Sequence, residues 1–182
     1  PLPGAEYNPL NRQTMTEKKQ IVHGLRLHYS GPFSVEEFYA EVEDWMEKKH
    51  LHKEIKRKSE HIVKNSKKGD WMIEAWKSFD HFEKEMIQIH ATMHDLKERS
   101  VIRNKKTVKF QYAEVYIEIN GYIESEYTYQ WTQAPIYYFV KSLYDKYIWP
   151  ILDKYDGAVY GDCYDLHKRL KAYFELYRMR VG

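Results

Sequence analysis

Nine histidines give this chain its clearest capacity for metal chemistry, because imidazole is a common ligand of zinc and other transition metals. His90 and His94 have a four-residue spacing that would place both rings on one side of a helix. The surrounding residues alternate between apolar and polar, however, and predict a strand, on which four residues span about 13 Å. That distance is too long for one ion, and His50 and His52 lie in a basic stretch that we expect to be exposed. The sequence therefore predicts no metal site and no cofactor.

His23 falls on the apolar side of the first alternating segment, so it is either a hydrogen-bonded core histidine, the commoner case, or a polar group inside a cavity. Paired carboxylates can do acid–base chemistry, and four glutamates flank a predicted turn: Glu114, Glu118, Glu124 and Glu126. On strand faces near a turn they are more typical of a solvated surface. Since no nucleophile is placed beside a base, an enzyme of the cyclase or hydrolase type is an alternative, not the leading hypothesis.

Tyrosine is unusually frequent, with 17 residues. Its ring can pack against apolar groups while its hydroxyl reaches water or a ligand, so it suits cores, cavity walls and interfaces alike. One face of a predicted strand carries Ile123, Ser125, Tyr127, Tyr129 and Trp131. Facing a cavity, the last three would form apolar walls with polar donors. Facing a filled core, they would only pack, and the sequence leaves both possibilities open.

Two basic clusters raise the question of an anionic partner. The first contains Lys48, Lys49, Lys53, Lys56, Arg57, Lys58, Lys64, Lys67 and Lys68, and the second contains Lys168, Arg169, Lys171, Arg178 and Arg180. Solvated faces are the usual explanation of such clusters. The alternative is an interaction module that binds nucleic acid or an acidic protein through residues 48–68. A net charge of only +2 gives the whole molecule no strong attraction to nucleic acid.

Length and composition predict one domain, because 182 residues can bury a substantial core. Cys163 is the single cysteine, which excludes an intrachain disulfide and fits a reducing compartment. A buried or surface cysteine is commoner than a nucleophile. We find no apolar run near 18 residues and no signal-peptide pattern, so we expect no transmembrane segment and a cytoplasmic location. The oligomeric state is not indicated.

The elements that position these residues begin after a proline-containing segment, residues 1–20, which we expect to be a disordered tail. Residues 21–182 are expected to form a single α+β domain. Residues 21–30 alternate and predict a strand. A helix follows, in which Ser34 and Glu37 form a capping box while Phe33 and Phe38 form a hydrophobic staple.

Further strands are predicted over residues 53–64, as a lysine-protected edge strand, and over 71–79 and 85–94. A polar connection over 96–106 precedes two more strands, 107–119 and 122–131. Asn120-Gly121 between them predicts a two-residue hairpin turn, because both residues tolerate the positive φ that such a turn requires.

A long aromatic helix is predicted over residues 135–155, with Pro135 in its first turn and a kink at Pro150. Asp156-Gly157 would end it, and Asp162 would begin an extra terminal helix. The predicted fold is therefore α+β: a curved antiparallel sheet of six strands packed against a long C-terminal helix, with one early helix and an extra terminal helix.

This order of elements over residues 21–155 is similar to the helix-grip fold of START-related lipid-transfer and polyketide-cyclase-like domains. The resemblance implies a curved sheet that wraps a long helix and encloses an apolar cavity. It therefore implies a carrier that holds an apolar or aromatic small molecule, lipid-like in character, between sheet and helix. The expected ligand-binding residues are His23, Trp71, Ile73, Ile89, Tyr127, Tyr129, Trp131, Phe139 and Leu143. The competing expectation is a core that the same side chains fill completely.

Overall fold

The structure, a computed structural model, describes residues 14–63, 66–80, 83–103, 106–128 and 155–181. The elements in this part of the chain are, in order, β1 (Thr14–Phe33), α1 (Val35–Lys48), β2 (His52–Val63), β3 (Ser66–Ser78), β4 (Glu83–Arg103), β5 (Lys106–Thr128) and α4 (Asp156–Val181). The strands form one antiparallel sheet in the spatial order β1-β5-β4-β3-β2. The earliest strand is therefore paired with the latest described one, and β2 is an edge strand, as the sequence predicts.

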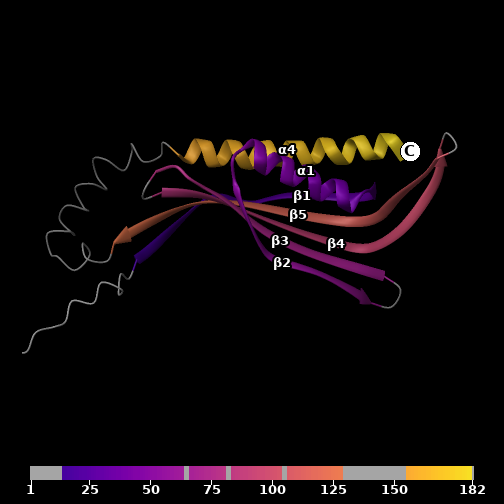
Figure 1. Ribbon diagram of the computed structural model, residues 1–182, viewed down its shortest axis with the longest axis horizontal. Helices are drawn as coiled ribbons and strands as arrows, with labels where there is room; N and C mark the ends of the chain where they lie inside the picture. The colour runs from indigo at the N-terminus through magenta and orange to yellow at the C-terminus, as the bar shows by residue number, and fades with distance from the viewer. Residues whose placement is uncertain (1–13, 64–65, 81–82, 104–105, 129–154, 182) are drawn as a thin grey trace, which may run out of the picture.

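Both helices lie on one face of the sheet, so the described molecule has two layers (Figure 1). The sheet is curved, and the far ends of β4 and β5 bend toward the helical layer beside the C-terminal end of α4. The predicted α+β class is confirmed: a curved antiparallel sheet carries one early helix and a C-terminal helix packed on it. The opposite face of the sheet is not covered by either described helix.

Local sequence signals explain why α1 forms where it does. The side chain of Ser34 accepts a hydrogen bond of 3.2 Å from the backbone N–H of Glu37, which satisfies one of the unpaired donors of the first turn. The apolar side chains recur at helical spacing and are buried in the core: Phe38, Val42, Trp45 and Met46. This helix is the one predicted from the capping box.

α4 is the helix that covers most of the sheet. Its buried side is formed by Val159, Cys163, Leu166, Leu170 and Phe174. The prediction that Asp156-Gly157 ends a helix is wrong, because both residues begin α4, and Asp162 lies within the helix instead of at its start. The long helix predicted over residues 135–155 falls, apart from Tyr155, outside the described residues.

The predicted hairpin turn at Asn120-Gly121 is also wrong, because β5 continues through both residues and pairs with strands on either side. The Asn120 side-chain oxygen accepts a hydrogen bond of 2.7 Å from the backbone N–H of Gly24, which has a positive φ of 53° in an irregular part of β1. Gly121 is instead needed for the close approach of α4. A Cβ atom there would lie 2.7 Å from the Cys163 sulfur and 2.8 Å from a methyl of Val159.

The strands β1, β3 and β4 extend further than predicted. Residues 14–20, assigned to the tail by the sequence analysis, are the first part of β1, and most of the predicted polar connection over 96–106 belongs to β4 and β5. The β4 ladder shifts register between His94 and Lys97, where Asp95 has a positive φ of 55°. Such a bulge bends a strand, and beyond it β4 carries exposed polar residues, which is why no apolar alternation marks this part.

Candidate functional site

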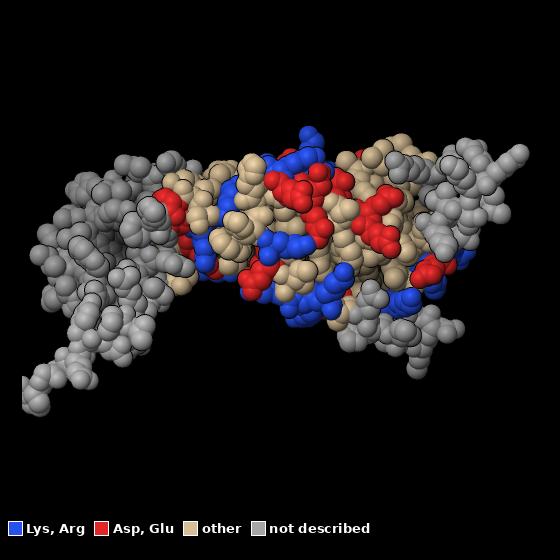
Figure 2. All heavy atoms as spheres, viewed as in Figure 1, with Lys and Arg blue, Asp and Glu red and all other residues tan. Residues whose placement is uncertain are grey.

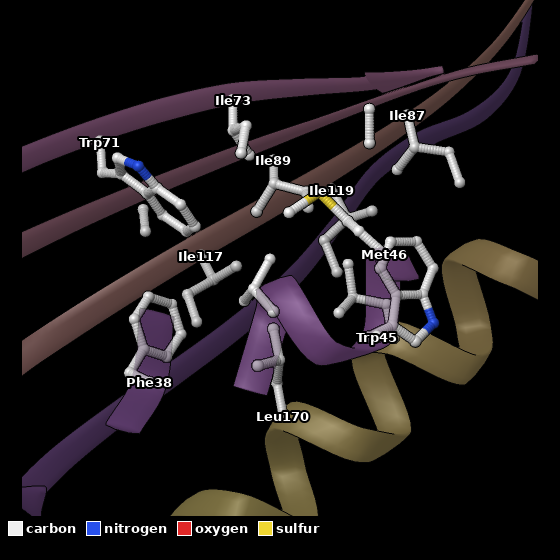
Figure 3. Close-up of a cluster of buried hydrophobic side chains, with 14 of the residues drawn as sticks. Phe38, Trp45, Met46, Trp71, Ile73, Ile87, Ile89, Ile117, Ile119 and Leu170 are labelled. Atoms are coloured by element: carbon white, nitrogen blue, oxygen red, sulfur yellow. The ribbon is translucent and has the colours of Figure 1, made fainter. Parts of the chain in front are cut away.

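Three of the predicted ligand-binding residues are core residues. Trp71, Ile73 and Ile89 are at most 3% exposed and belong to the main apolar cluster. In Figure 3 side chains from the sheet, from α1 and from α4 converge on this cluster, among them Phe38, Trp45, Met46, Ile117 and Leu170. These side chains form one apolar cluster in the described part of the layer between sheet and helices.

Of the remaining predicted site residues, His23 is the one whose side chain the structure describes, and it does not join that cluster. His23 is exposed rather than on the apolar face, because two register shifts around Val22 interrupt the alternation of β1. Tyr127 lies in β5, near the end of the described strand. Four residues fall outside the described part of the chain: Tyr129, Trp131, Phe139 and Leu143.

The basic residues of β2 lie on both faces of the sheet and are largely paired with acids. On the helical side Lys53 is paired with Glu43 of α1, and the Lys58 ammonium lies 4.7 Å from the centre of the Tyr39 ring. Other cations of this stretch are bound to neighbouring carboxylates, as in the pairs Lys56–Glu74 and Arg57–Asp70. Figure 2 shows positive and negative side chains intermingled on the face it displays. The stretch is therefore not a single positive surface.

A charged cluster under α4 was missed by the sequence analysis. Glu85 is fully buried on the helical face of the sheet. One of its carboxylate oxygens forms an ion pair with the Lys77 ammonium at 3.0 Å, without the geometry of a hydrogen bond. Lys77 also contacts Asp162 of α4 at 2.7 Å. Lys77 continues the inward-facing alternation of β3 that contains Ile73, and Glu85 continues that of β4 that contains Ile87. This alternation is the sequence signal that could have revealed the two residues.

Burial sets the protonation behaviour of this cluster. Desolvation raises the pKa of the Glu85 carboxyl above its ordinary value, and Lys77 only partly opposes that effect. Desolvation alone would lower the pKa of Lys77, but the attraction of the Asp162 and Glu85 carboxylates outweighs this and raises it. Desolvation, with the nearby charges of Glu85 and Asp162, raises the pKa of the buried Cys163 thiol to about 12. A thiol that stays protonated is a poor nucleophile.

The open face of the sheet carries a different arrangement, built by the register of three strands. Arg26, Glu118 and His90 face one another across β1, β5 and β4. His28, Tyr116 and Thr92 form the next row of the same face. Because side chains on one face alternate every second residue, the two rows are about 7 Å apart along the strands.

Between the two rows lies a depression of about 520 Å³, which we call the slot. It is lined by Arg26, Leu27, His28, His90, Thr92, Tyr116, Ile117 and Glu118. The backbone of Leu27 and Ile117 lies between the rows and forms the floor, because the side chains of both residues face the helical layer. The other six residues form the two walls.

The first wall of the slot is aromatic. The rings of His28 and Tyr116 are stacked, with centroids 4.5 Å apart and planes at 19°. Glu114 holds both rings from one carboxylate oxygen: it accepts a hydrogen bond of 2.6 Å from the Tyr116 hydroxyl and lies 3.1 Å from Nε2 of His28. The hydrogen bonds from Tyr116 and His28 hold the pKa of Glu114 below its usual value. The wall thus has a fixed orientation although Tyr116 is 43% exposed.

The second wall is polar. Glu118 accepts hydrogen bonds from Asn120 at 3.2 Å and from Nε of Arg26 at 3.1 Å. These contacts lower the pKa of its carboxyl, and the bond from Asn120 has the largest effect. Nε2 of His90 lies 2.7 Å from Asp70, which also binds Arg57. Burial alone would raise the pKa of Asp70, but Arg57 and His90 lower it. Both carboxylates are therefore ionised at neutral pH.

Comparisons with known proteins do not identify the chain: no protein-family model and no curated protein matches it. Among the described residues, no group of three or more histidine, cysteine or acidic side chains could hold a metal ion. None of the helices in the described ranges is long and apolar enough to cross a bilayer. The predicted cytoplasmic location stays a prediction.

Proposed function

We propose that this protein is a small-molecule-binding protein and that its ligand is a planar molecule held in the slot on the open face of the sheet. The observation that carries the proposal is the depression of about 520 Å³ between two rows of side chains, one aromatic and one polar. A ring in van der Waals contact with a group on each side needs about 7 Å between those groups. The rows of the slot are spaced by about that distance along the strands, and one of them presents the stacked pair of His28 and Tyr116.

The volume of the slot supports the same function. Sites for small molecules occupy about 300–1,000 Å³, and the slot, at about 520 Å³, lies within this range. The ordered hydrogen bonds of Glu114 and Glu118 pre-set the wall side chains, which reduces the entropy lost on binding.

The interior site predicted from the helix-grip resemblance has less support, because Trp71, Ile73 and Ile89 belong to the buried apolar cluster. The START-related resemblance itself remains a proposal. The interaction module for nucleic acid or an acidic protein also has less support, since cations of β2 are bound to neighbouring carboxylates.

Replacement of Tyr116 tests the proposal. We expect Tyr116→Ala to weaken binding of planar aromatic fragments, such as indole and benzamidine, by about five- to 100-fold, because stacking on one aromatic side chain contributes that much. Ligand-detected NMR titrations of wild type and variant would measure the change.

Tyr112→Ala is the matched control. Tyr112 lies on the same face of the same strand and is 45% exposed, but it does not line the slot. Binding that Tyr116→Ala leaves unchanged, or that Tyr112→Ala weakens equally, would contradict the proposal.

A further inference from the structure

The polar side chains of the slot indicate which kind of planar molecule it accepts. Glu118 is ionised, and each of its oxygens accepts one hydrogen bond from the protein. A carboxylate offers about four acceptor positions, so Glu118 retains acceptor capacity. Its side chain is 40% exposed, so that capacity is accessible from the slot.

His90 is held in the polar wall by Asp70. Its Nε2 lies 2.7 Å from an oxygen of Asp70, and an ionised carboxylate can only accept. Nε2 must therefore carry the proton. Asp70 also binds Arg57 at 2.7 Å, which fixes the carboxylate that orients His90.

The charges around the slot also favour a ligand that carries hydrogen-bond donors. Three carboxylates, those of Asp70, Glu114 and Glu118, adjoin its walls, against the two guanidinium groups of Arg26 and Arg57. Arg26 is the cation of the slot itself, but it is 79% exposed and its Nε is directed at Glu118.

We infer that the slot selects planar rings that carry hydrogen-bond donors on one edge, as in amino-substituted heteroaromatic rings and aromatic amidines. This inference rests on the proposed binding function. The ring would lie between the two walls, and an N–H group at its edge would donate to the carboxylate of Glu118. A ring whose edge offers only acceptors would meet Glu118 with repulsion.

Two probes of the same size test the inference. Benzamidine has a donor edge and benzoate has an acceptor edge on the same ring. We expect benzamidine to bind at least tenfold more tightly than benzoate, measured by protein-detected NMR titration with shifts centred on the slot residues. We expect Glu118→Gln to weaken benzamidine by about tenfold or more, because hydrogen bonds to charged groups are the stronger ones.

Glu98→Gln is the matched control, because Glu98 is an exposed carboxylate of the same sheet that does not line the slot. Benzoate binding in the slot as tightly as benzamidine would overturn the donor rule while leaving the proposed function in place. If neither probe nor indole shifts the resonances of the slot residues, the proposed function is overturned as well. Equal weakening by Glu98→Gln and Glu118→Gln would show a general charge effect and would also overturn the inference.

Discussion

Gly121 is the residue at which α4 comes closest to the sheet. A Cβ atom at this position would lie 2.7 Å from the Cys163 sulfur and 2.8 Å from Val159, closer than packed atoms allow. We expect Gly121→Ala to lower the free energy of unfolding by about 1–3 kcal/mol, because α4 must shift to admit the methyl group. Chemical denaturation followed by circular dichroism would measure it.

Gly157→Ala serves as the control, since a Cβ atom there meets nothing within 4 Å and the residue lies in the first turn of α4. It should be neutral or stabilising by up to about 1 kcal/mol. Similar destabilisation by both substitutions would show that the close approach at Gly121 is not the cause.

Glu85 makes stability depend on pH in a direction opposite to that of most paired carboxylates. Its pKa in the folded protein is raised above the ordinary value of 4.5, mainly by desolvation. The folded state therefore binds the proton more tightly than the unfolded state, and stability falls as pH rises from the unfolded pKa through the folded pKa. We expect the difference in unfolding free energy, wild type minus Glu85→Gln, to decrease over that interval.

Carboxylates with lowered pKa values, such as Glu114 and Glu118, contribute the opposite trend, but they are common to both proteins and cancel in the difference. Denaturant titrations at several pH values between about 4 and 8 would give the two curves. A difference that stays constant or increases with pH would contradict this role of Glu85.

At the scale of elements, the Asn120 side chain of β5 binds the irregular part of β1. Asn120 is only 9% exposed, and its oxygen accepts hydrogen bonds from the Gly24 backbone and from the Gln20 side chain. We expect Asn120→Ala to cost about 1–3 kcal/mol of stability, because it leaves the N–H of Gly24 without its partner. Gln20→Ala removes one of the two donors at a half-buried position and should cost less; the reverse order would contradict this account.

The same element shows what the sequence could and could not predict. The start of α1 was predictable because the bond between Ser34 and Glu37 is local. The turn at Asn120-Gly121 was predicted wrongly because its alternative, pairing with both β1 and β4, depends on residues distant in sequence. The slot could not be predicted for the same reason: Arg26 and Glu118 are 92 residues apart and meet only through the strand order.

For the whole molecule, the distribution of charge is the property that bears on partners. Positive and negative groups pair across the strands, and the net charge is +2. We expect the protein to pass through a heparin column without retention at about 150 mM salt, where unpaired surface charges are already screened beyond about 8 Å. Retention that falls steeply with added salt would instead support an anionic partner.

The central claim is that the ligand site lies on the open face of the sheet and not between the sheet and the helices. The most direct measurement is a backbone NMR map of benzamidine binding to the uniformly labelled protein. We expect the shifts to centre on Arg26, His90 and Tyr116 and to disappear in Tyr116→Ala. Shifts centred on the core residues Trp71, Ile73 and Ile89, and retained in Tyr116→Ala, would contradict the claim and place the site in the interior.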